Sequence, residues 1–580
     1  MDNISSRTMD FVNNPNIILI LRFPTRRRLP EEKSERESVC DLCHHLFSVC
    51  LMERSSTPSY VTPYVTYVND ITSVPSSNVT IISSYLLDII ACFSGYSDGI
   101  NHSFLSDDSD EEFCANLQQR HVSVPNTDRL DKHEISFATK QACGITDSSS
   151  KQNLSIASMI QKRTIGPAFS TAEKCWISNS FLPNKFDLIT KYNSRIYCGS
   201  YSKDGNFFLT ATQDSWLRVY NTHNGKFTQL KSIPARDVGW SILDTAFSPD
   251  GSTIVYSSWS ECLYQCSVSE NSTTQESLLL GPGVRRFCVF SLVFSNDGRE
   301  ILGGANDGKL YVYDRECRQR VLRVAGHYDD VNAVAFADNT SQIFYSAGDD
   351  GLCKVWDKRT LTETDPRPVG VLAGHMDGIT YIDSRGDSRY LITNCKDQTI
   401  KLWDVRVFSG EIGKMNTRKA VSSQNWDYRW QPVPKRLRKP RDLLEGDTSV
   451  MTYRGHSVLQ TLIRCHFSPA DTTGQRYIYT GCSTGRVIVY DVLTGKIVRK
   501  LFGHAMCVRD VSWHPFYPHI VSTSWDSTIA RWRYVSDAKY ISYSDMEDTE
   551  NEIEIQPQKL RRSERIAAQQ ARNATFNSTS

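Results

Sequence analysis

Histidine, serine or threonine, and aspartate recur together at fixed spacings in the C-terminal two thirds of this sequence, and these residue types could perform hydrolytic chemistry. In a hydrolase such a set supplies a nucleophile, a general base and an orienting acid, and it is needed only once, at a pocket. Repetition therefore favours a structural role. The sequence has no nucleophile elbow, phosphate-binding glycine loop or metalloprotease helix, so it predicts a protein that is not an enzyme and needs no cofactor. The recurring sets are His327, Ser346 and Asp350; His375, Thr393 and Asp397; and His504, Ser522 and Asp526.

A second group of reactive residue types, CDLCHH at 40–45, could bind a metal or haem. C-x-x-C-H is the attachment pattern of haem c, which forms only after export, and the chain shows no export signal. Zinc would need four ligands, for which Cys40, Cys43, His44 or His45, and Cys50 are available. An ordinary pair of reduced cysteines is the simpler interpretation, and we expect no metal. The odd total of 17 cysteines, without a disulfide framework, is typical of a reducing compartment.

The bulk composition excludes several classes of protein. The net charge of +1 over 580 residues lacks the positive bias of a dedicated nucleic-acid-binding protein. No run of 18 apolar residues could cross a bilayer, and NIILILRF near residue 20 is too short to do so. We therefore expect a soluble intracellular protein, present in the nucleus and the cytoplasm.

The composition and residue patterns of the sequence predict three regions. Residues 1–170 are rich in Ser, Thr and Asn, with an acidic run at 106–112 and one apolar patch at 80–93, and we expect them to be mostly disordered. Residues 171–535 alternate short β-branched and aromatic runs with turn signals such as SPDG and NDG, the pattern of many antiparallel strands. Residues 536–580 read as a disordered, charged tail.

Seven strand-ending residues divide the middle region into repeats of about 42 to 47 residues, with one step of about 87. The long step contains the polar insertion 407–450, which we interpret as lying between two blades. Aspartate usually stands six residues before the aromatic, and Ser or Thr ten before it. The strand-ending residues are Tyr220, Cys266, Tyr313, Trp356, Trp403, Tyr490 and Trp532, and Gly-His pairs open four units at His327, His375, His456 and His504.

These offsets resemble those of the WD-repeat family, and the resemblance covers residues 190–535. It implies an all-β fold, a seven-bladed β-propeller with largely disordered extensions at both ends. It also implies that Asp, His, Ser or Thr, and Trp form a hydrogen-bonded set within a blade. A buried imidazole or indole needs such partners, because an unpaired buried polar group costs about 1–3 kcal/mol. The residues assigned to these tetrads are the three sets named above together with Trp532.

Arginine three positions after the strand-ending aromatic occurs only in KVWDKR and KLWDVR, at Arg359 and Arg406 of neighbouring repeats. The other repeats hold unrelated residues there, so the fold does not require it. The chain leaves a blade for solvent at this position, about 10 Å past the buried aromatic. Two exposed guanidinium groups on one face of a rigid disc could anchor carboxylates or carbonyls of another protein.

This doublet is similar to the W-D-x-R box of substrate receptors for cullin-4 ubiquitin ligases. The resemblance implies that the boxes bind the adaptor, damage-specific DNA-binding protein 1, which joins the receptor to the cullin-4 scaffold. A third match, NWDYRW at 425–430, lies in the insertion and lacks the upstream offsets, so we do not count it as a box and expect it to pack against the disc. The predicted docking residues are Trp356, Asp357, Arg359, Trp403, Asp404 and Arg406.

A closer resemblance is to one family within this class, the cullin-4-associated factor 11 or WD repeat-containing protein 23 type. It is carried by ARDVGWSILD (235–244), GREILGGANDG (298–308), DDVNAVAFAD (329–338), QNWDYRWQ (424–431) and CVRDVSWHPF (507–516). It implies that a protein substrate is presented for ubiquitination and proteasomal degradation, with stress-response regulators as one substrate class. The rival hypothesis is a WD-repeat scaffold in RNA processing or another nuclear complex.

Two further surfaces follow from the propeller hypothesis. The basic cluster PKRLRKPR (434–441) is a solvated loop, a nuclear-import signal, or a contact for an acidic partner or nucleic acid. The residue five after each Gly-His histidine, and its equivalents in other repeats, should lie near a mouth of the channel and suit a short peptide with an acidic and an apolar element. The predicted mouth residues are Tyr197, Phe290, Asn332, Thr380 and Arg509, with Leu243 and Ile463 at matching positions.

Overall fold

The computed structural model describes residues 17–19, 51–53, 125–145, 156–166, 168–269, 274–281, 283, 286–438 and 443–536. The chain divides into two compact units, Met1–Gln119 and Arg120–Ser580. In the first unit, strands β1 (Ile17–Leu19) and β2 (Leu51–Glu53) pair antiparallel. Among the described residues, no helix is long and apolar enough to span a membrane.

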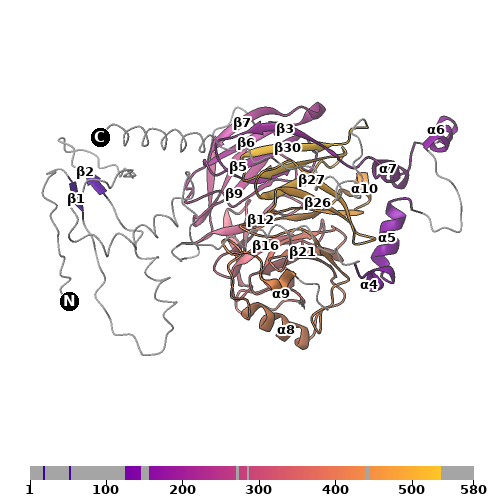
Figure 1. Ribbon diagram of the computed structural model, residues 1–580. Helices are drawn as coiled ribbons and strands as arrows, with labels where there is room; N and C mark the ends of the chain where they lie inside the picture. The colour runs from indigo at the N-terminus through magenta and orange to yellow at the C-terminus, as the bar shows by residue number, and fades with distance from the viewer. Residues whose placement is uncertain are drawn as a thin grey trace, which may run out of the picture. The chain divides into compact units, whose positions relative to one another are not determined.

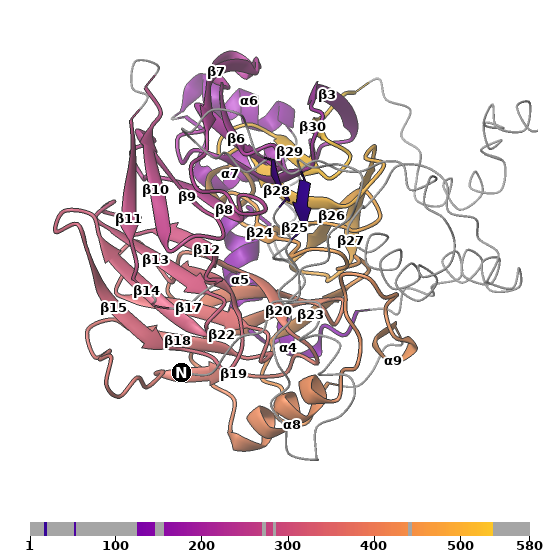
Figure 2. The same cartoon turned by 90° about the vertical axis from the view of Figure 1, so that its left-hand side faces the viewer.

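Seven four-stranded antiparallel sheets, the blades, form the second unit, and this confirms the predicted seven-bladed propeller. Figure 2 shows the blades arranged around a common centre. The first three blades are β4 (Ile196–Tyr201), β5 (Phe207–Thr212), β6 (Trp216–Asn221) and β7 (Thr228–Pro234); β8 (Asp244–Phe247), β9 (Thr253–Ser257), β10 (Cys262–Ser267) and β11 (Gln275–Leu279); and β12 (Val289–Phe294), β13 (Glu300–Ala305), β14 (Lys309–Asp314) and β15 (Gln319–Ala325).

The remaining blades repeat this order, with one exception at the end. They are β16 (Val331–Phe336), β17 (Ile343–Gly348), β18 (Cys353–Asp357) and β19 (Gly370–Leu372); β20 (Ile379–Ser384), β21 (Tyr390–Cys395), β22 (Thr399–Asp404) and β23 (Met451–Arg454); β24 (Cys465–Phe467), β25 (Tyr477–Gly481), β26 (Arg486–Asp491) and β27 (Ile497–Phe502); and β28 (Val508–Trp513), β29 (His519–Ser524) and β30 (Thr528–Arg533), joined by β3 (Lys185–Lys191).

Strand β3 closes the ring. It precedes the first blade in the sequence but pairs antiparallel with β30 of the last, with Phe186 opposite Trp532. The outermost strand of blade seven therefore comes from the N-terminal end of the propeller sequence. This arrangement ties the first and last blades together through backbone hydrogen bonds, and it leaves no open seam between them.

Consecutive strands alternate in direction, so the loops of all blades gather on two opposite faces. The Gly-His face holds the Gly-His loops and the turn between the second and third strands, and the box face holds the ends of the third strands at Asp357 and Asp404. Glycine is required in some of these turns. Gly308 has a φ of +72°, and a Cβ there would lie 2.6 Å from the carbonyl oxygen of His327.

Four helices before the propeller were not predicted from the sequence. They are α4 (Asp128–Asp131), α5 (Glu134–Ala142), α6 (Ile156–Ile165) and α7 (Thr171–Ser178). Figure 1 shows α4, α5 and α7 along one face of the propeller, beside the short helix α10 (Ala470–Thr473). Leu130 and Ile135 are buried in the same apolar cluster as Tyr390 of blade five, so α4 and α5 belong to the propeller core. A capping box between Ser170 and Glu173 begins α7.

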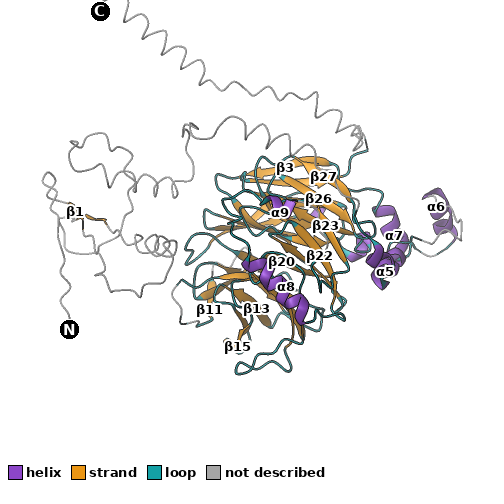
Figure 3. Ribbon diagram, turned by 60° about the horizontal axis from the view of Figure 1, so that its bottom comes forward, coloured by secondary structure: helices purple, strands orange, loops and turns teal. Residues whose placement is uncertain are grey.

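The insertion 407–450 lies within blade five, between β22 and β23, and not between two blades as the repeat period indicated. A sequence repeat ends with the third strand of a blade, so the fourth strand of that blade is counted with the following repeat. The insertion contains α8 (Glu411–Ser422) and α9 (Lys435–Arg438), which Figure 3 shows at the side of the propeller. Its start bonds to blade four, where Ser409 N donates to the Val371 carbonyl at 2.9 Å. A single 3₁₀ turn, His223–Gly225, completes the described elements.

Candidate functional site

The three predicted tetrads are hydrogen-bonded as expected. In blade four, His327 Nδ1 donates to the Asp350 carboxylate at 2.9 Å, and its Nε2 accepts from the Ser346 hydroxyl at 2.7 Å. The Trp356 indole N–H donates to the same hydroxyl at 2.8 Å. Burial lowers the pKa of His327, which keeps the ring neutral. Equivalent bonds join His375 to Asp397 and Thr393, with Trp403, and His504 to Asp526 and Ser522, with Trp532.

In blade six the buried histidine forms hydrogen bonds with different partners. Thr484 stands at the aspartate position and Tyr490 at the tryptophan position. His456 Nδ1 lies 3.0 Å from the Tyr490 hydroxyl, and its Nε2 lies 2.9 Å from Asn394 Oδ1 of the neighbouring blade. The bond to the amide oxygen assigns the proton to Nε2, the opposite tautomer to that in the tetrads. The repeated histidines are thus structural throughout the described propeller.

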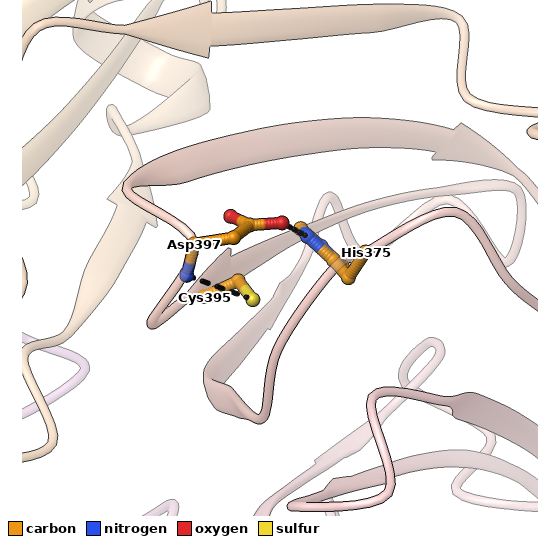
Figure 4. A group of neighbouring side chains, drawn as sticks. All are labelled: His375, Cys395 and Asp397. Atoms are coloured by element: carbon orange, nitrogen blue, oxygen red, sulfur yellow. Dashed lines mark hydrogen bonds and ion pairs between the residues drawn. The ribbon is translucent and has the colours of Figure 1, made fainter. Parts of the chain in front are cut away.

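His375, Cys395 and Asp397 lie close enough to hold a metal ion, as Figure 4 shows, but their chemistry does not fit one. The His375 ring already has a partner on each nitrogen. Burial raises the pKa of the Cys395 thiol well above its usual value, so the sulfur stays protonated, and it lies 3.1 Å from the Asp377 carbonyl. A metal-binding cysteine must be a thiolate. The other candidate metal ligands, Cys40, Cys43, His44 and Cys50, lie outside the described residues.

The two W-D-x-R boxes end equivalent strands, β18 and β22, of adjacent blades, so they lie on the same face of the disc. In each box the tryptophan is buried as a member of a tetrad. Arg359 follows two residues after β18. Its Nε and Nη2 donate to the Asp357 carboxylate at 2.9 and 2.7 Å, while 64% of its side chain remains exposed. The hydrogen bonds from Arg359 hold the pKa of Asp357 below its usual value.

The second box repeats this geometry beside a further arginine, Arg389, and a histidine, His133. Arg406 Nη2 donates to the Asp404 carboxylate at 3.0 Å, and 53% of its side chain is exposed. The buried Asp404 also accepts from Arg389, at 3.2 Å, and lies 3.3 Å from His133. Glu134, the first residue of α5, bridges Arg389 and Arg406. Each aspartate therefore fixes the direction of an arginine whose outer edge still faces solvent.

The third W-D-x-R match has the same local bond on the other face. Arg429 Nη2 donates to Asp427 at 2.6 Å, and no strand carries the pair. Trp426 Nε1 donates to the Asp377 carboxylate at 2.8 Å, and Lys396 lies 4.4 Å from the centre of the Tyr428 ring. Asp377 and Lys396 belong to loops of the Gly-His face. The motif thus packs against the disc, as expected, away from the two boxes.

The residues predicted to form a substrate mouth need correction. Tyr197, Asn332, Thr380 and Arg509 are at most 4% exposed, and Leu243 and Ile463 are also buried; only Phe290 is half-buried. Each of these residues lies in the first strand of a blade or one to two residues before it. Side chains at this position bond to neighbouring blades. Arg509, for example, donates to the carbonyls of Tyr197 and Leu243. A peptide could not reach them from solvent.

The channel interior is filled by an ionic network that the sequence analysis did not detect. Arg464 of blade six is buried and donates to Asp510 of blade seven at 3.0 Å and to Asp244 of blade two at 2.5 Å. Asp510 and Asp244 also accept backbone N–H groups of the next blade, from Gly199 and Leu292. Fully paired buried charges of this kind fix geometry. The network links blades six, seven and two across the centre of the disc.

Part of the basic cluster is used inside the insertion. Arg436 Nη2 donates to the Ser423 carbonyl at 2.7 Å and to Gln424 Oε1 at 2.5 Å. Lys435 is exposed, and Lys439 and Arg441 lie outside the described residues. The predicted import signal therefore stays a prediction that rests on the remaining cations.

Comparison with known proteins agrees with the architecture. The family model for the WD domain, G-beta repeat, matches residues 187–221, 282–314, 318–357, 366–404 and 495–533. It matches no strand of blade two and only the last strand of blade six, the two blades in which Ser260 and Thr484 replace the turn aspartate. These two blades still have four strands each, because burial of their alternating apolar residues does not depend on the tetrad.

Curated relatives match about two thirds of the chain. A DDB1- and CUL4-associated factor 11 homolog from Caenorhabditis elegans is 44% identical over 62% of this chain, and the match spans 64% of that relative's length. One from Caenorhabditis briggsae is 40% identical over 69% of this chain and 74% of its own length. A LEC14B homolog from Prunus armeniaca is 43% identical over 64% of this chain and 78% of its own. The chain therefore belongs to the WD40-repeat family of DDB1- and CUL4-associated factor 11 homologues.

Proposed function

We propose that the protein is a substrate receptor of a cullin-4 ubiquitin ligase, which docks the damage-specific DNA-binding protein 1 adaptor through Arg359 and Arg406. The names of its relatives describe association with DDB1 and CUL4. The observation that carries the proposal is the pair of boxes: two guanidinium groups on adjacent blades, each oriented by its own aspartate and each more than half exposed.

This geometry suits recognition of another protein. A bidentate aspartate satisfies one edge of the guanidinium group and removes its rotational freedom, so less conformational entropy is lost on binding. The remaining N–H groups can donate to carbonyl or carboxylate oxygens of the adaptor. In this role the receptor is not catalytic: it holds a protein substrate near the ubiquitin-transferring subunits, and the modified substrate is then degraded by the proteasome.

Recovery of the adaptor with the purified full-length chain tests the proposal. Arg359→Ala with Arg406→Ala should reduce adaptor recovery at least tenfold, while thermal stability changes little, because both side chains are exposed. Arg429→Ala is the matched control: it removes the same aspartate–arginine bond from the Gly-His face and should leave recovery unchanged. Equal recovery by the double variant and the wild type would overturn the proposal.

We also propose that the receptor works in both nucleus and cytoplasm. Replacing Lys435, Lys439 and Arg441 with glutamine removes three cations of the basic cluster and leaves Arg436, which bonds within the insertion, in place. Fluorescence microscopy should then show a shift of the tagged chain towards the cytoplasm. An unchanged distribution would mean that the cluster is not the import signal.

A further inference from the structure

Aromatic rings form a continuous rim on the Gly-His face across blades seven, one, two and three. Trp240, in the loop before β8, packs edge-on against Tyr197 with ring centroids 5.5 Å apart, and Trp525 lies 5.7 Å from the same tyrosine ring. On the other side, Trp259 faces Phe290 at 6.5 Å. We call these five residues the tryptophan rim. Gly239 joins its two halves, since a Cβ there would lie 2.8 Å from Trp259 Cβ.

Two tryptophans of the rim expose more apolar surface than is favourable for a protein surface that no other molecule covers. Trp240 is 56% exposed and Trp259 is 38% exposed, although tryptophan has the largest apolar surface of any residue. Contiguous exposed aromatic side chains on a rigid scaffold mark surfaces that another molecule covers. The rim also lies on the face opposite the boxes, separated from them by at least the length of a six-residue strand, about 20 Å. An adaptor on the box face would leave it accessible.

The rim is rich in donors. The Arg195 guanidinium lies 4.9 Å from the centre of the Trp525 ring, and in the described part of the chain it forms no ion pair. The buried Trp525 indole N–H and Tyr197 hydroxyl have no hydrogen-bond acceptor among the described residues. Arg236, in the same loop as Trp240, is exposed, and among the described residues its side chain has one hydrogen bond, to the Gln275 carbonyl at 3.5 Å. A ligand with an acceptor, and above all an anionic one, would complement these groups.

Among the described residues no acidic group of the same loops pairs with Arg195, although Glu261, in the turn after Trp259, is exposed. Asp237 accepts hydrogen bonds from the Ser260 and Tyr264 hydroxyls. Asp214, in the turn before β6, pairs with Arg218 at 2.6 Å. Local carboxylates therefore do not neutralise Arg195. A nucleic-acid strand would require a row of cations along its backbone, and two arginines do not supply one.

We infer that the tryptophan rim is the substrate-capture site, and that it takes an extended peptide segment in which a carboxylate side chain stands next to an apolar one. The carboxylate binds Arg195, and the apolar side chain packs on Trp240 and Trp259. This inference rests on the proposed function, because capture leads to ubiquitination only if the adaptor binds the other face. It moves the determinants of substrate choice from the predicted mouth residues to Arg195, Trp240 and Trp259 in the loops around them.

Fluorescence polarisation with labelled octapeptide libraries tests this directly on the full-length chain. One library has a fixed central Glu-Leu, a second has Gln-Leu, and a third has Glu-Ser, with all other positions randomised. We expect the Glu-Leu library to bind at least tenfold more tightly than the other two. Trp240→Ala should lower that affinity at least tenfold, and Arg195→Gln should abolish the preference for glutamate over glutamine.

Trp430→Ala is the matched control, because Trp430 is 80% exposed on the same face but lies in the insertion, outside the rim. It should bind the libraries as the wild type does. Failure of the Glu-Leu library to bind preferentially, or equal binding by Trp240→Ala and wild type, would overturn the inference. Binding that is restored only when residues 537–580 are deleted would also overturn it, by showing that the chain's own acidic tail is the natural occupant.

Adaptor recovery separates this inference from the proposed function. If Trp240→Ala retains adaptor recovery and loses peptide binding, both stand and the variant is folded. If adaptor recovery is intact while peptide binding ignores the rim, only the capture site is wrong. If the wild type binds the peptide but never the adaptor, the proposed function fails and the rim remains a peptide-binding surface of a protein with another role.

Discussion

Glu134 and Arg406 are 272 positions apart in the sequence, and their side chains meet at 3.4 Å on the box face. The same carboxylate binds Arg389 at 2.5 Å. Helix α5 is thereby connected to the second box, whereas the ion pair of Arg359 is with its own Asp357. The two boxes share their local geometry but differ in what surrounds them.

Glu134→Gln should weaken adaptor binding by less than about threefold, much less than Arg406→Ala. The reason is that the pair is exposed on both sides, and exposed ion pairs contribute about 0–1 kcal/mol. Asp404 continues to orient Arg406 without it. Biolayer interferometry with purified adaptor measures the dissociation constants. A loss as large as that of Arg406→Ala would show that Glu134 itself contacts the adaptor.

Ser346→Ala should destabilise the propeller by about 2–3 kcal/mol. Its hydroxyl serves both His327 Nε2 and the Trp356 indole N–H, so the change leaves two buried polar groups unpaired. Chemical denaturation measures the free energy of unfolding. Thr484→Ala is the control in blade six, where the threonine lies beside Cys482 and not beside His456. Similar losses in both variants would contradict the tetrad argument.

Lys401→Met should cost about 3–5 kcal/mol of stability. Lys401 Nζ lies 2.6 Å from the Asp447 carboxylate, both side chains are buried, and the change leaves the carboxylate without a cation. The double variant Lys401→Met with Asp447→Leu should recover most of this loss, since no buried charge remains.

Lys414→Met supplies the control for that cycle within the same insertion. Its partner Glu411 is exposed, so we expect a change below about 0.5 kcal/mol. Equal losses for Lys401→Met and Lys414→Met would mean that burial does not determine the effect.

Stability should fall as the pH rises from 7 to 9 because of His466. Burial opposes the charged ring, but the carboxylates of Asp383 and Asp510 outweigh it and raise the pKa of His466 to about 9. An unfolded histidine titrates near 6.5, so the native state binds the proton more tightly between these values. The stabilisation is therefore complete below pH 6.5 and is lost through pH 9.

Melting temperatures from pH 7 to 9 measure this effect against His466→Gln, whose curve should be flatter. Burial also raises the pKa of thiols such as those of Cys288 and Cys353, so they too lower stability as the pH approaches 9, but in wild type and variant alike. The difference between the two curves therefore isolates the contribution of His466. Parallel curves for wild type and variant would contradict the prediction.

Local chemistry that repeats was predictable from the sequence. Six aromatics and Cys266, about 42 to 47 residues apart except for one longer step, indicated seven blades, because the register of each blade is set by its own turn and apolar alternation. The position of the boxes followed in the same way from strand length. What composition concealed was α4 and α5: Leu130 and Ile135 become buried only against Tyr390, a residue some 260 positions later.

Contacts across the disc were not predictable by the same means. Asn332 and Arg509 were assigned to an open mouth because strand alignment gives the position of a residue and not what lies opposite it. Arg464, which pairs with Asp244 and Asp510 of other blades, belongs to no repeat pattern. Trp240 and Trp259, by contrast, left a signal in the sequence: each is a tryptophan inside a turn segment, where a buried role is unusual.

Closure of the ring by β3 affects how the protein is made. The partner of β3 ends at Arg533, about 350 residues later in the sequence. Because ribosomes add roughly 5–20 residues per second, β3 is synthesised on the order of 20 to 70 s before the strand with which it pairs. A message cut short anywhere in the last blade would leave both the first strand and the final sheet with open edges. Quality control should therefore treat nearly complete chains as it treats very incomplete ones.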